Sequence, residues 1–193
     1  HRTGDAVRAS PLVVDNRVII PSTDNWLYVL DASTGGLLWK LDLGSMSTSS
    51  PALYENTLFV PTWAGKVYAY DRSQFGLRWV KQLGEPGMLE NYAIVTTPAV
   101  GDGILYVGSN DRRVYALSVD GEVVWSFSAN EKPSDPVTDN QRVYFGTRSG
   151  TFYALNAETG ALVWSVDCDG PILSSPTVTD QHVVFGTSKG KLY

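Results

Sequence analysis

Residues 153–164 contain Tyr153-Ala154-Leu155-Asn156-Ala157-Glu158-Thr159-Gly160 and end on Trp164. Apolar residues lead into a polar turn that closes on glycine, and a second apolar run carries the chain to the tryptophan. The pattern recurs around tyrosines that are 40, 47, 38 and 40 residues apart, namely Tyr28, Tyr68, Tyr115, Tyr153 and Tyr193. A period of about 40 residues with several short apolar runs is typical of β-propeller blades.

Two further residue types keep the same rhythm. Prolines open the units at Pro11, Pro51, Pro98, Pro136 and Pro176, and tryptophans close them at Trp39, Trp79, Trp125 and Trp164. Chance is a poor explanation for three residue types, Tyr, Pro and Trp, that recur with the same spacing. We therefore expect one propeller domain or fragment over residues 1–193, with repeat units at approximately 10–48, 49–96, 97–133, 134–174 and 175–193.

The fourth unit shows how each repeat divides into strands. Short runs rich in β-branched and aromatic residues span 136–138, 142–146, 151–155 and 161–166. Asn, Asp and Gly separate them, as tight hairpins require, and no apolar pattern at helical spacing extends past two turns. The sequence predicts an all-β propeller of four-stranded antiparallel blades, with four full blades and a partial fifth, either open or part of a larger ring.

The repeated polar and aromatic residues have ordinary structural explanations. The Asp and Asn residues of the turns do not form the alternating acidic run of a calcium loop, so we interpret them as hairpin residues. The tryptophan of each outer strand buries a large apolar area, and we expect it to pack between blades. Neither series is interpreted as a ligand site.

Composition excludes several classes of function. The net charge is −5 and the longest basic cluster is Arg112-Arg113, which disfavours nucleic-acid binding. No apolar run approaches the length of a membrane span. The single cysteine, Cys168, cannot form an internal disulfide and fits either a reducing compartment or the bacterial envelope. We interpret it as a surface or half-buried structural thiol, because neither histidine forms the pattern of a Cys/His pair.

The repeat resembles the pyrroloquinoline-quinone-like repeat family, whose unit ends in Leu-Tyr-Ala-Leu-Asp-Ala-x-Thr-Gly followed by Trp. Unit four matches nearly throughout, and unit one matches from Tyr28 to Trp39. Unit two departs at residues 72–75 and unit three shortens its turn to 118–121. The resemblance covers essentially the whole chain, and it implies the fold more specifically than the function.

The resemblance implies a non-catalytic role more than a catalytic one. The namesake dehydrogenases use an adjacent cysteine pair, calcium ligands and a catalytic Asp, and this chain has no such pair. The non-catalytic relatives include the propeller lipoprotein of the outer-membrane β-barrel assembly machinery and sensor-like propellers. The leading hypothesis is therefore a scaffold or sensor that binds a protein or small ligand, without catalytic residues, cofactor or metal. The family favours a periplasmic or other extracytoplasmic location.

The alternative is a fragment of a PQQ-dependent alcohol or sugar dehydrogenase-like oxidoreductase whose catalytic residues lie outside this chain. Only this alternative implies PQQ and calcium as cofactors.

Closure of the propeller bears on partners. Both ends of the sequence cut through a repeat unit, and the sequence is about twelve residues short of five units. Because an open blade edge invites association, we consider three arrangements: part of a longer propeller, which we favour, a five-bladed ring, or two copies that complete a larger ring. The expected partners are thus a protein, the rest of a longer propeller, or a second copy through the open edges.

The loop face is the candidate binding surface. In a propeller, the turns between second and third strands share a face with the links between blades, and the insertion of about seven residues between Trp79 and Pro98 joins them. Aromatic and Arg residues are the usual anchors of interfaces. The candidate partner-binding residues on these turns and the insertion are Trp26, Trp63, Tyr92, Arg112, Arg148 and Lys189. Packing of the two tryptophans against 88–89, and ordinary solvation of the basic residues, remain the alternatives.

Overall fold

The computed structural model describes residues 1–84, 93–179 and 181–193, and these residues form strands and turns but no helix. The chain divides into two compact units, His1–Val95 and Thr96–Tyr193, and each is described by itself. The insertion between Trp79 and Pro98 falls largely on residues 85–92, outside the described part of the chain.

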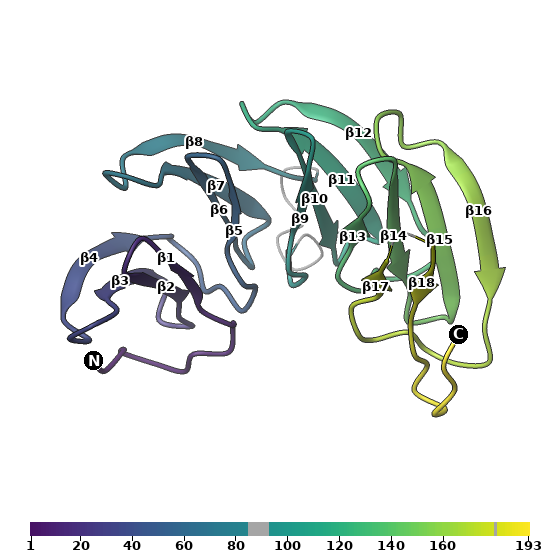
Figure 1. Cartoon of the computed structure of the whole chain (residues 1–193), viewed down its shortest axis with the longest axis horizontal. Coiled ribbons are helices and arrows are strands. Elements are labelled where there is room, and N and C mark those ends of the chain that lie inside the picture. Colours follow the sequence, from purple (N-terminus) through teal and green to yellow (C-terminus); the bar gives the residue numbers. More distant parts are fainter. Residues whose placement is uncertain (85–92, 180) are drawn as a thin grey trace. The chain divides into compact units, whose positions relative to one another are not determined.

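Unit 1 contains two four-stranded antiparallel sheets, each a blade with its strands in sequence order (Figure 1). The first blade consists of β1 (Leu12–Val14), β2 (Arg17–Pro21), β3 (Trp26–Asp31) and β4 (Leu37–Asp42). The second blade consists of β5 (Ala52–Tyr54), β6 (Thr57–Pro61), β7 (Lys66–Asp71) and β8 (Leu77–Gln82).

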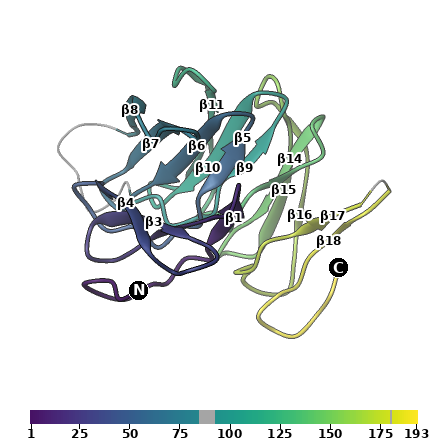
Figure 2. The same cartoon turned by 60° about the vertical axis from the view of Figure 1, so that its left-hand side comes forward.

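Unit 2 contains two more blades of the same kind and a final strand pair. The third blade is β9 (Ala99–Gly101), β10 (Ile104–Ser109), β11 (Arg113–Ser118) and β12 (Val123–Ser128). The fourth is β13 (Val137–Thr138), β14 (Arg142–Gly146), β15 (Thr151–Asn156) and β16 (Leu162–Asp167). The pair is β17 (Thr177–Val178) with β18 (Val183–Val184), which run beside each other near the C-terminus (Figure 2). Gly186 forms a bridge with Leu192, so the last residues fold back along the pair.

Two local devices repeat from blade to blade. In the hairpin between the first two strands, non-glycine residues adopt positive φ, among them Asp15, Glu55 and Asn140. Asp and Asn are the non-glycine residues that tolerate this conformation best. The hairpin between the last two strands is held by an Asx side chain. In the fourth blade, Asn156 Oδ1 accepts hydrogen bonds from the Glu158 and Thr159 amides at 3.1 and 2.8 Å.

The core lies between neighbouring blades. Second and third strands are buried: in unit 1 the cluster includes Ile19, Val29 and Leu58, and in unit 2 it includes Val143 and Phe145. Outer strands are far more exposed, and all six residues of β16 are exposed. The blades therefore stack through the faces of their central strands, with the outer strands at the rim.

The outer-strand tryptophans follow the predicted role in part. Trp39 packs on Phe75 of the next blade, and Trp125 on Ala157 of the next blade, as expected for residues that fill the space between blades. Trp164 does not: 37% of it is exposed, and its described ring contacts are with Tyr144 and Phe152 of its own blade.

Candidate functional site: the turns between second and third strands

The candidate site in unit 1 is the turn between β6 and β7, which carries Trp63. The Trp63 amide donates to the carbonyl of Met46 at 2.9 Å, so the link between the two blades lies against this turn. The Trp63 indole nitrogen donates to Thr48 Oγ1 at 2.8 Å, while 37% of the residue is exposed. The proximity of turn and link, expected from propeller geometry, is observed within this unit.

The backbone beneath Trp63 is fixed by its neighbours. Thr62 is fully buried, and its hydroxyl donates to the Lys66 carbonyl at 3.1 Å. Gly65 adopts φ of 73° and its amide donates to the Thr62 carbonyl, which closes the turn. The indole therefore projects from a defined backbone and is tethered at one end, so little side-chain freedom remains to be lost on binding.

Trp26 occupies a different position from Trp63. It is the first residue of β3 and pairs with Asp42, two residues before Tyr28, whereas Trp63 stands five residues before Tyr68 in the turn itself. The Lys40 ammonium lies 4.4 Å from the centroid of the Trp26 ring, and the side chain is half-buried. A cation over an indole is favourable, and here it covers one ring face within the blade. The two tryptophans are thus not equivalent residues of one turn.

Arg112 marks the turn between β10 and β11 in unit 2. It is exposed and adopts φ of 68°, the conformation that Gly65 and Gly150 supply in other blades. Its Nε lies 3.9 Å from a carboxylate oxygen of Glu131, on the link to the next blade. Because the Arg112 side chain is largely exposed, this ion pair contributes little to stability.

Arg148 and Lys189 lie on the next two turns of unit 2, and both are exposed. The Arg148 amide donates to the Lys132 carbonyl at 3.2 Å, and the neighbouring Ser188 amide donates to the Pro171 carbonyl at 2.8 Å. Each turn therefore lies against a link, as the Trp63 turn does in unit 1. Among the described residues, neither basic side chain forms a hydrogen bond or ion pair, so both cations face solvent.

Tyr92 lies outside the described residues, as do 88–89, against which packing of the tryptophans was considered. The chain can be followed again from Ala93. The Ile94 amide donates to the Thr62 carbonyl at 3.2 Å, and the Ile94 carbonyl accepts from the Ser49 hydroxyl at 3.2 Å. The residue that follows the insertion is thus anchored at the base of the Trp63 turn.

Sequence reasoning missed Thr48 and Glu131, the partners of Trp63 and Arg112. Both lie on links between blades, 15 and 19 residues away from the residues they contact. The repeat indicates that links and turns share a face, but the register between a particular turn and link residue is set by three-dimensional packing. No local sequence signal marks these two residues.

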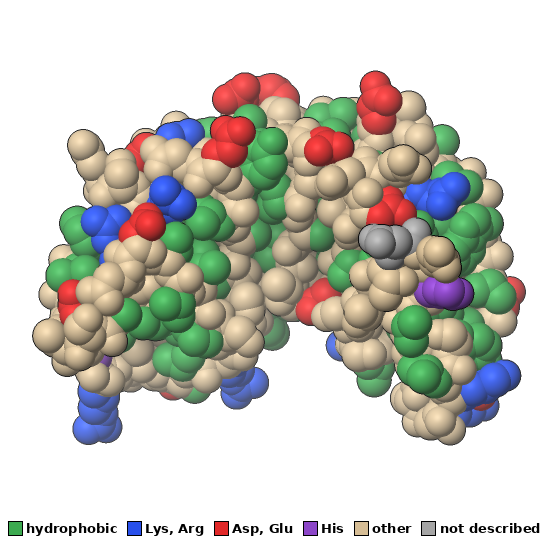
Figure 3. Space-filling model, in the orientation of Figure 1, with side chains coloured by type: hydrophobic (Ala, Val, Ile, Leu, Met, Phe, Trp, Pro, Cys, Tyr) green, Lys and Arg blue, Asp and Glu red, His purple; other side chains and the backbone are tan. Residues whose placement is uncertain are grey.

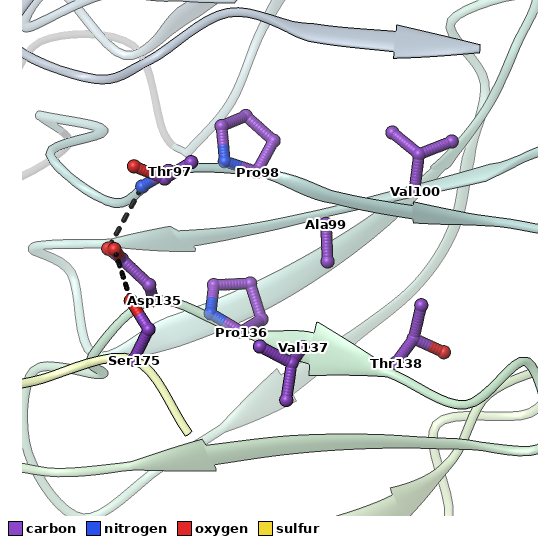
Figure 4. A pocket seen from close by; sticks show the side chains of 9 residues that line it. All are labelled: Thr97, Pro98, Ala99, Val100, Asp135, Pro136, Val137, Thr138 and Ser175. Carbon is purple, nitrogen blue, oxygen red and sulfur yellow. Dashed lines mark hydrogen bonds between the residues drawn. The ribbon is translucent and has the colours of Figure 1, made fainter. Parts of the chain in front are cut away.

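A groove of about 320 Å³ runs between the inner strands β9 and β13 of unit 2 (Figure 4). Its polar centre is Asp135, which accepts one hydrogen bond from the Thr97 amide and one from the Ser175 hydroxyl, both at 2.9 Å. Pro98, Pro136 and neighbouring β-branched residues line the rest. Both carboxylate oxygens of Asp135 already accept hydrogen bonds from the protein itself. We therefore interpret the groove as a contact that links the blades and not as a ligand site.

The described residues contain no group of three or more His, Cys, Asp and Glu that could hold a metal ion. In that part of the chain, a helix long and apolar enough to cross a membrane is likewise absent. Cys168 is partly buried, and burial raises the pKa of its thiol, as do the carboxylates of Asp169 and Asp167. A raised thiol pKa disfavours the reactive thiolate.

Comparison with known proteins places these features in a family. The family model described as outer membrane protein assembly factor BamB matches residues 2–110 and 110–193. The BamB of Yersinia pestis is 38% identical over 86 residues, covering 44% of this chain and 22% of the relative. The BamB of Shewanella oneidensis is 32% identical over 111 residues, covering 50% and 28%. The matched segments thus span about half of this chain and about a quarter of the length of these relatives.

A second group of relatives carries a different name. The dehydrogenase subunit of alcohol dehydrogenase (quinone) from Gluconacetobacter polyoxogenes is 36% identical over 88 residues, covering 39% of this chain and 12% of the relative. Both groups thus match part of the chain at similar identity.

Solved structures agree on the fold. The crystal structure of BamB from Moraxella catarrhalis superposes with a TM-score of 0.80 at 19% identity, covering all of this chain and 62% of that one. Quinohemoprotein alcohol dehydrogenase ADHIIG from Pseudomonas putida HK5 gives 0.78 at 16% identity, covering all of this chain and 40% of that one. The predicted all-β propeller and the resemblance to the PQQ-like repeat family are therefore confirmed.

Proposed function

Because this chain belongs to the family of outer membrane protein assembly factor BamB, we propose that it is a non-enzymatic scaffold of outer membrane protein assembly. It acts in the cell envelope, outside the cytoplasm, and binds a protein partner through the turns between second and third strands. This role requires no cofactor. Assembly relatives support the scaffold; they give no support to the sensor or small-ligand parts of the sequence hypothesis.

The observation that carries the proposal is that Trp63 is exposed and yet held in place by hydrogen bonds. A large aromatic side chain is exposed over more than a third of its surface, yet its backbone and its indole nitrogen are both tied down. Exposed, preorganised aromatic residues are the usual anchors of protein interfaces. Burial of the remaining indole surface against a partner would therefore gain apolar contact at little entropic cost.

The basic turn residues of unit 2 favour an acidic partner. Arg148 and Lys189 project from two successive turns without intramolecular partners among the described residues. The protein as a whole carries a net charge of −5, so these local cations distinguish the turns from the rest of the surface. Such charges act mainly on the association rate and on its dependence on salt.

The proposal is tested with a photo-activatable cross-linker placed at position 63 in the cell envelope. The expected result is a cross-link to a protein of the outer membrane assembly machinery, with no such product from Val13, which is 63% exposed on an inner strand. With the purified partner, Trp63→Ala should weaken binding at least 10-fold while the thermal midpoint stays nearly unchanged. A large loss of stability with unchanged binding would overturn the proposal.

The quinone alcohol dehydrogenase relatives favour one second candidate, a fragment of a quinoprotein oxidoreductase. This chain has no adjacent cysteine pair and its described residues hold no acidic cluster for calcium, so this candidate places the catalytic residues outside the chain. Addition of quinone and calcium, followed by absorbance spectroscopy and dye reduction with alcohols, tests the candidate. Incorporation of quinone would favour the oxidoreductase over the scaffold.

A further inference from the structure

The outer strand of each blade forms one edge of its sheet. In the third blade this strand is β12, and the strands of the sheet follow the order β12-β11-β10-β9 (Figure 1). An edge strand presents N–H and C=O groups that an added strand can pair with, and proteins usually protect such edges with charged residues, proline or bulges. The outer strands of the four blades differ in how far they are protected in this way.

Of the four outer strands that the structure describes, β12 is the one without a charged residue. Its six residues are Val-Val-Trp-Ser-Phe-Ser, with no proline. The other three carry charged residues, namely Lys40 and Asp42 in β4, Arg78 and Lys81 in β8, and Asp167 in β16. All four blades share the register shift opposite the start of the outer strand, so this irregularity does not distinguish β12. Uncharged segments of high β-propensity are the ones most prone to pair with other strands.

The backbone of β12 has outward-facing groups at Ser126 and Ser128. The Ala129 amide donates to the Arg112 carbonyl at 2.8 Å, so the backbone groups of residue 129 point toward β11. Because the direction alternates along an antiparallel strand, the N–H and C=O groups of Ser128 and Ser126 point away from β11. Both serines are exposed, and β12 pairs with no second strand among the described residues. This edge is therefore open to an added strand.

The two faces of β12 differ in what they already contact. On one face Trp125 is 9% exposed, and its indole nitrogen donates at 2.9 Å to the carbonyl of Ala157, the residue after Asn156 in the third hairpin of the next blade. On the opposite face, the Arg113 guanidinium donates to Ser126 Oγ at 3.2 Å. The first face is thus occupied within the protein, whereas the second carries an exposed cation.

Arg113 places its charge beside the open edge. Its side chain extends from β11 across Ser126, next to the place of a residue paired with Ser126 from outside. The Asp111 carboxylate, which is near in sequence, accepts from the Arg113 amide at 3.0 Å and from the Tyr115 hydroxyl at 2.6 Å. The Arg113 guanidinium itself forms no ion pair with a carboxylate in the described part of the chain. A partner residue with a negative charge therefore fits beside it.

The fourth blade shows that this charge is particular to β12. By strand register, Thr151 stands where Arg113 does, and Asp167 stands where Ser128 does. Hydrophobic side chains also gather over β16 (Figure 3), but the charge on that edge is negative. An acidic segment therefore fits β12 and is repelled by β16.

We propose that β12 binds an extended segment of a partner protein, which becomes a fifth strand of the third blade. The segment pairs antiparallel with residues 124–128 and places an acidic side chain beside Arg113. Its apolar side chains cover Val123 and Val124, which are 42% and 48% exposed. In such strand addition the main-chain hydrogen bonds supply affinity, and the side-chain contacts supply specificity.

The probe is the fluorophore-labelled peptide Thr-Val-Glu-Val-Val-Thr, whose Glu lies opposite Ser126 in antiparallel pairing. Fluorescence anisotropy follows its binding to the full 193-residue chain, and NMR follows the exchange of the Ser126 and Ser128 amide hydrogens. Saturating peptide should slow the exchange of both amides about 10-fold or more, because both become hydrogen-bonded.

Two protein variants test the backbone and the charge separately. Ser126→Pro removes an outward N–H where an edge strand tolerates proline, and it should weaken binding about 10-fold. Ser165→Pro is the matched control at the same register position of β16, and it should leave binding unchanged. Arg113→Gln should weaken binding of the peptide about 3-fold, and it should leave a peptide with Gln in place of Glu unaffected. Thermal midpoints of all variants are measured alongside.

Two modified peptides give a test that leaves the protein unaltered. N-methylation of the Glu amide removes a hydrogen bond to the Ser126 carbonyl and should weaken binding about 10-fold. N-methylation of the valine that follows the Glu should be tolerated, because its amide faces away from β12. The site lies in unit 2, so Trp63→Ala in unit 1 should leave peptide binding unchanged, and the scaffold role through the Trp63 turn can fail or hold independently.

Absence of saturable binding, equal affinity of the two N-methylated peptides, or unchanged exchange of the Ser126 and Ser128 amides would overturn the proposal. So would self-association that Ser126→Pro abolishes and the peptide does not inhibit, since β12 would then pair with a second copy of the chain. Saturable binding that depends on Ser126 and on the Glu amide of the peptide supports the proposal.

Discussion

Phe75 shows most directly how a single residue serves the space between blades. It adopts φ of 57°, a region that bulky residues rarely enter, at the position where Gly35 and Gly160 stand in other blades. It is nevertheless 4% exposed and packs against Trp39 and Arg17. The buried Phe75 ring, which packs against Trp39, compensates for the strained backbone.

Phe75→Gly should therefore destabilise the protein although it removes backbone strain. The left-handed conformation costs about 1–2 kcal/mol for a non-glycine residue, while loss of a buried Phe costs about 3–5 kcal/mol. The expected net loss is about 2 kcal/mol, measured by urea unfolding. An increase in unfolding free energy would mean that strain outweighs the packing of Phe75.

Asp71 makes the third hairpin of the second blade sensitive to acid. The Ser73 hydroxyl, the Arg78 guanidinium and the Gln74 amide all donate to its carboxylate and lower its pKa. A lowered native pKa contributes stability above the unfolded value of about 4, and this contribution is lost as the pH falls below it. The stability of this turn should thus decline on acidification.

Asp71→Asn isolates that contribution. Asn156 forms the same turn in the fourth blade, so the variant should keep the fold while losing the ion pair with Arg78. The difference between the urea midpoints of the two proteins should be largest at pH 7 and should shrink on acidification to pH 3, as the pH approaches the lowered pKa of Asp71. A difference that stays constant across this range would rule out Asp71 as the source of the acid sensitivity.

At the scale of elements, the inner strands are tied together by the residues that precede their prolines. The Ser10 amide donates to Ser50 Oγ at 3.0 Å in unit 1, while in unit 2 Asp135 accepts from both Thr97 and Ser175. A carboxylate at this position can serve two neighbours at once. It binds the start of β13 to the third blade and to the segment that leads into β17.

Asp135→Ala should lower the unfolding free energy by about 1–2 kcal/mol, because the Thr97 amide loses its acceptor. Asp135→Asn retains one carbonyl acceptor and should lie between the two proteins. Thermal unfolding of the three proteins measures the series. A stability of Asp135→Ala equal to that of the original protein would show that water replaces the carboxylate without cost.

Sequence periodicity predicted the elements well and the site less well. The strands expected at 142–146 and 151–155 are β14 and β15 to within one residue, because alternation and turn residues are local signals. The hydrogen bond from Trp63 to Thr48 and the covering of Trp26 by Lys40 were not predictable. Both depend on the three-dimensional register between segments, which the repeat does not specify.

At the scale of the whole molecule, the two compact units predict local responses to damage. Repeat architectures transmit instability mainly to neighbouring repeats. Gly160→Val would force a side chain into the Trp125 ring at a position of positive φ. Hydrogen exchange should accelerate in β9–β16 and remain unchanged in β1–β8, as read by mass spectrometry. Uniform acceleration over both units would indicate a single cooperative structure.

Recognition of a main-chain oxygen after the Asx residue has an evolutionary consequence. Every amino acid carries that oxygen, so Ala157 and Arg72 satisfy the same contact with unrelated side chains. A substitution at this position leaves the hydrogen bond between blades intact. A substitution of the donor requires another donor in its place, and Arg17 and Trp125 are two such donors. The side chain at this position can therefore diverge between blades while the contact with the main-chain oxygen is kept.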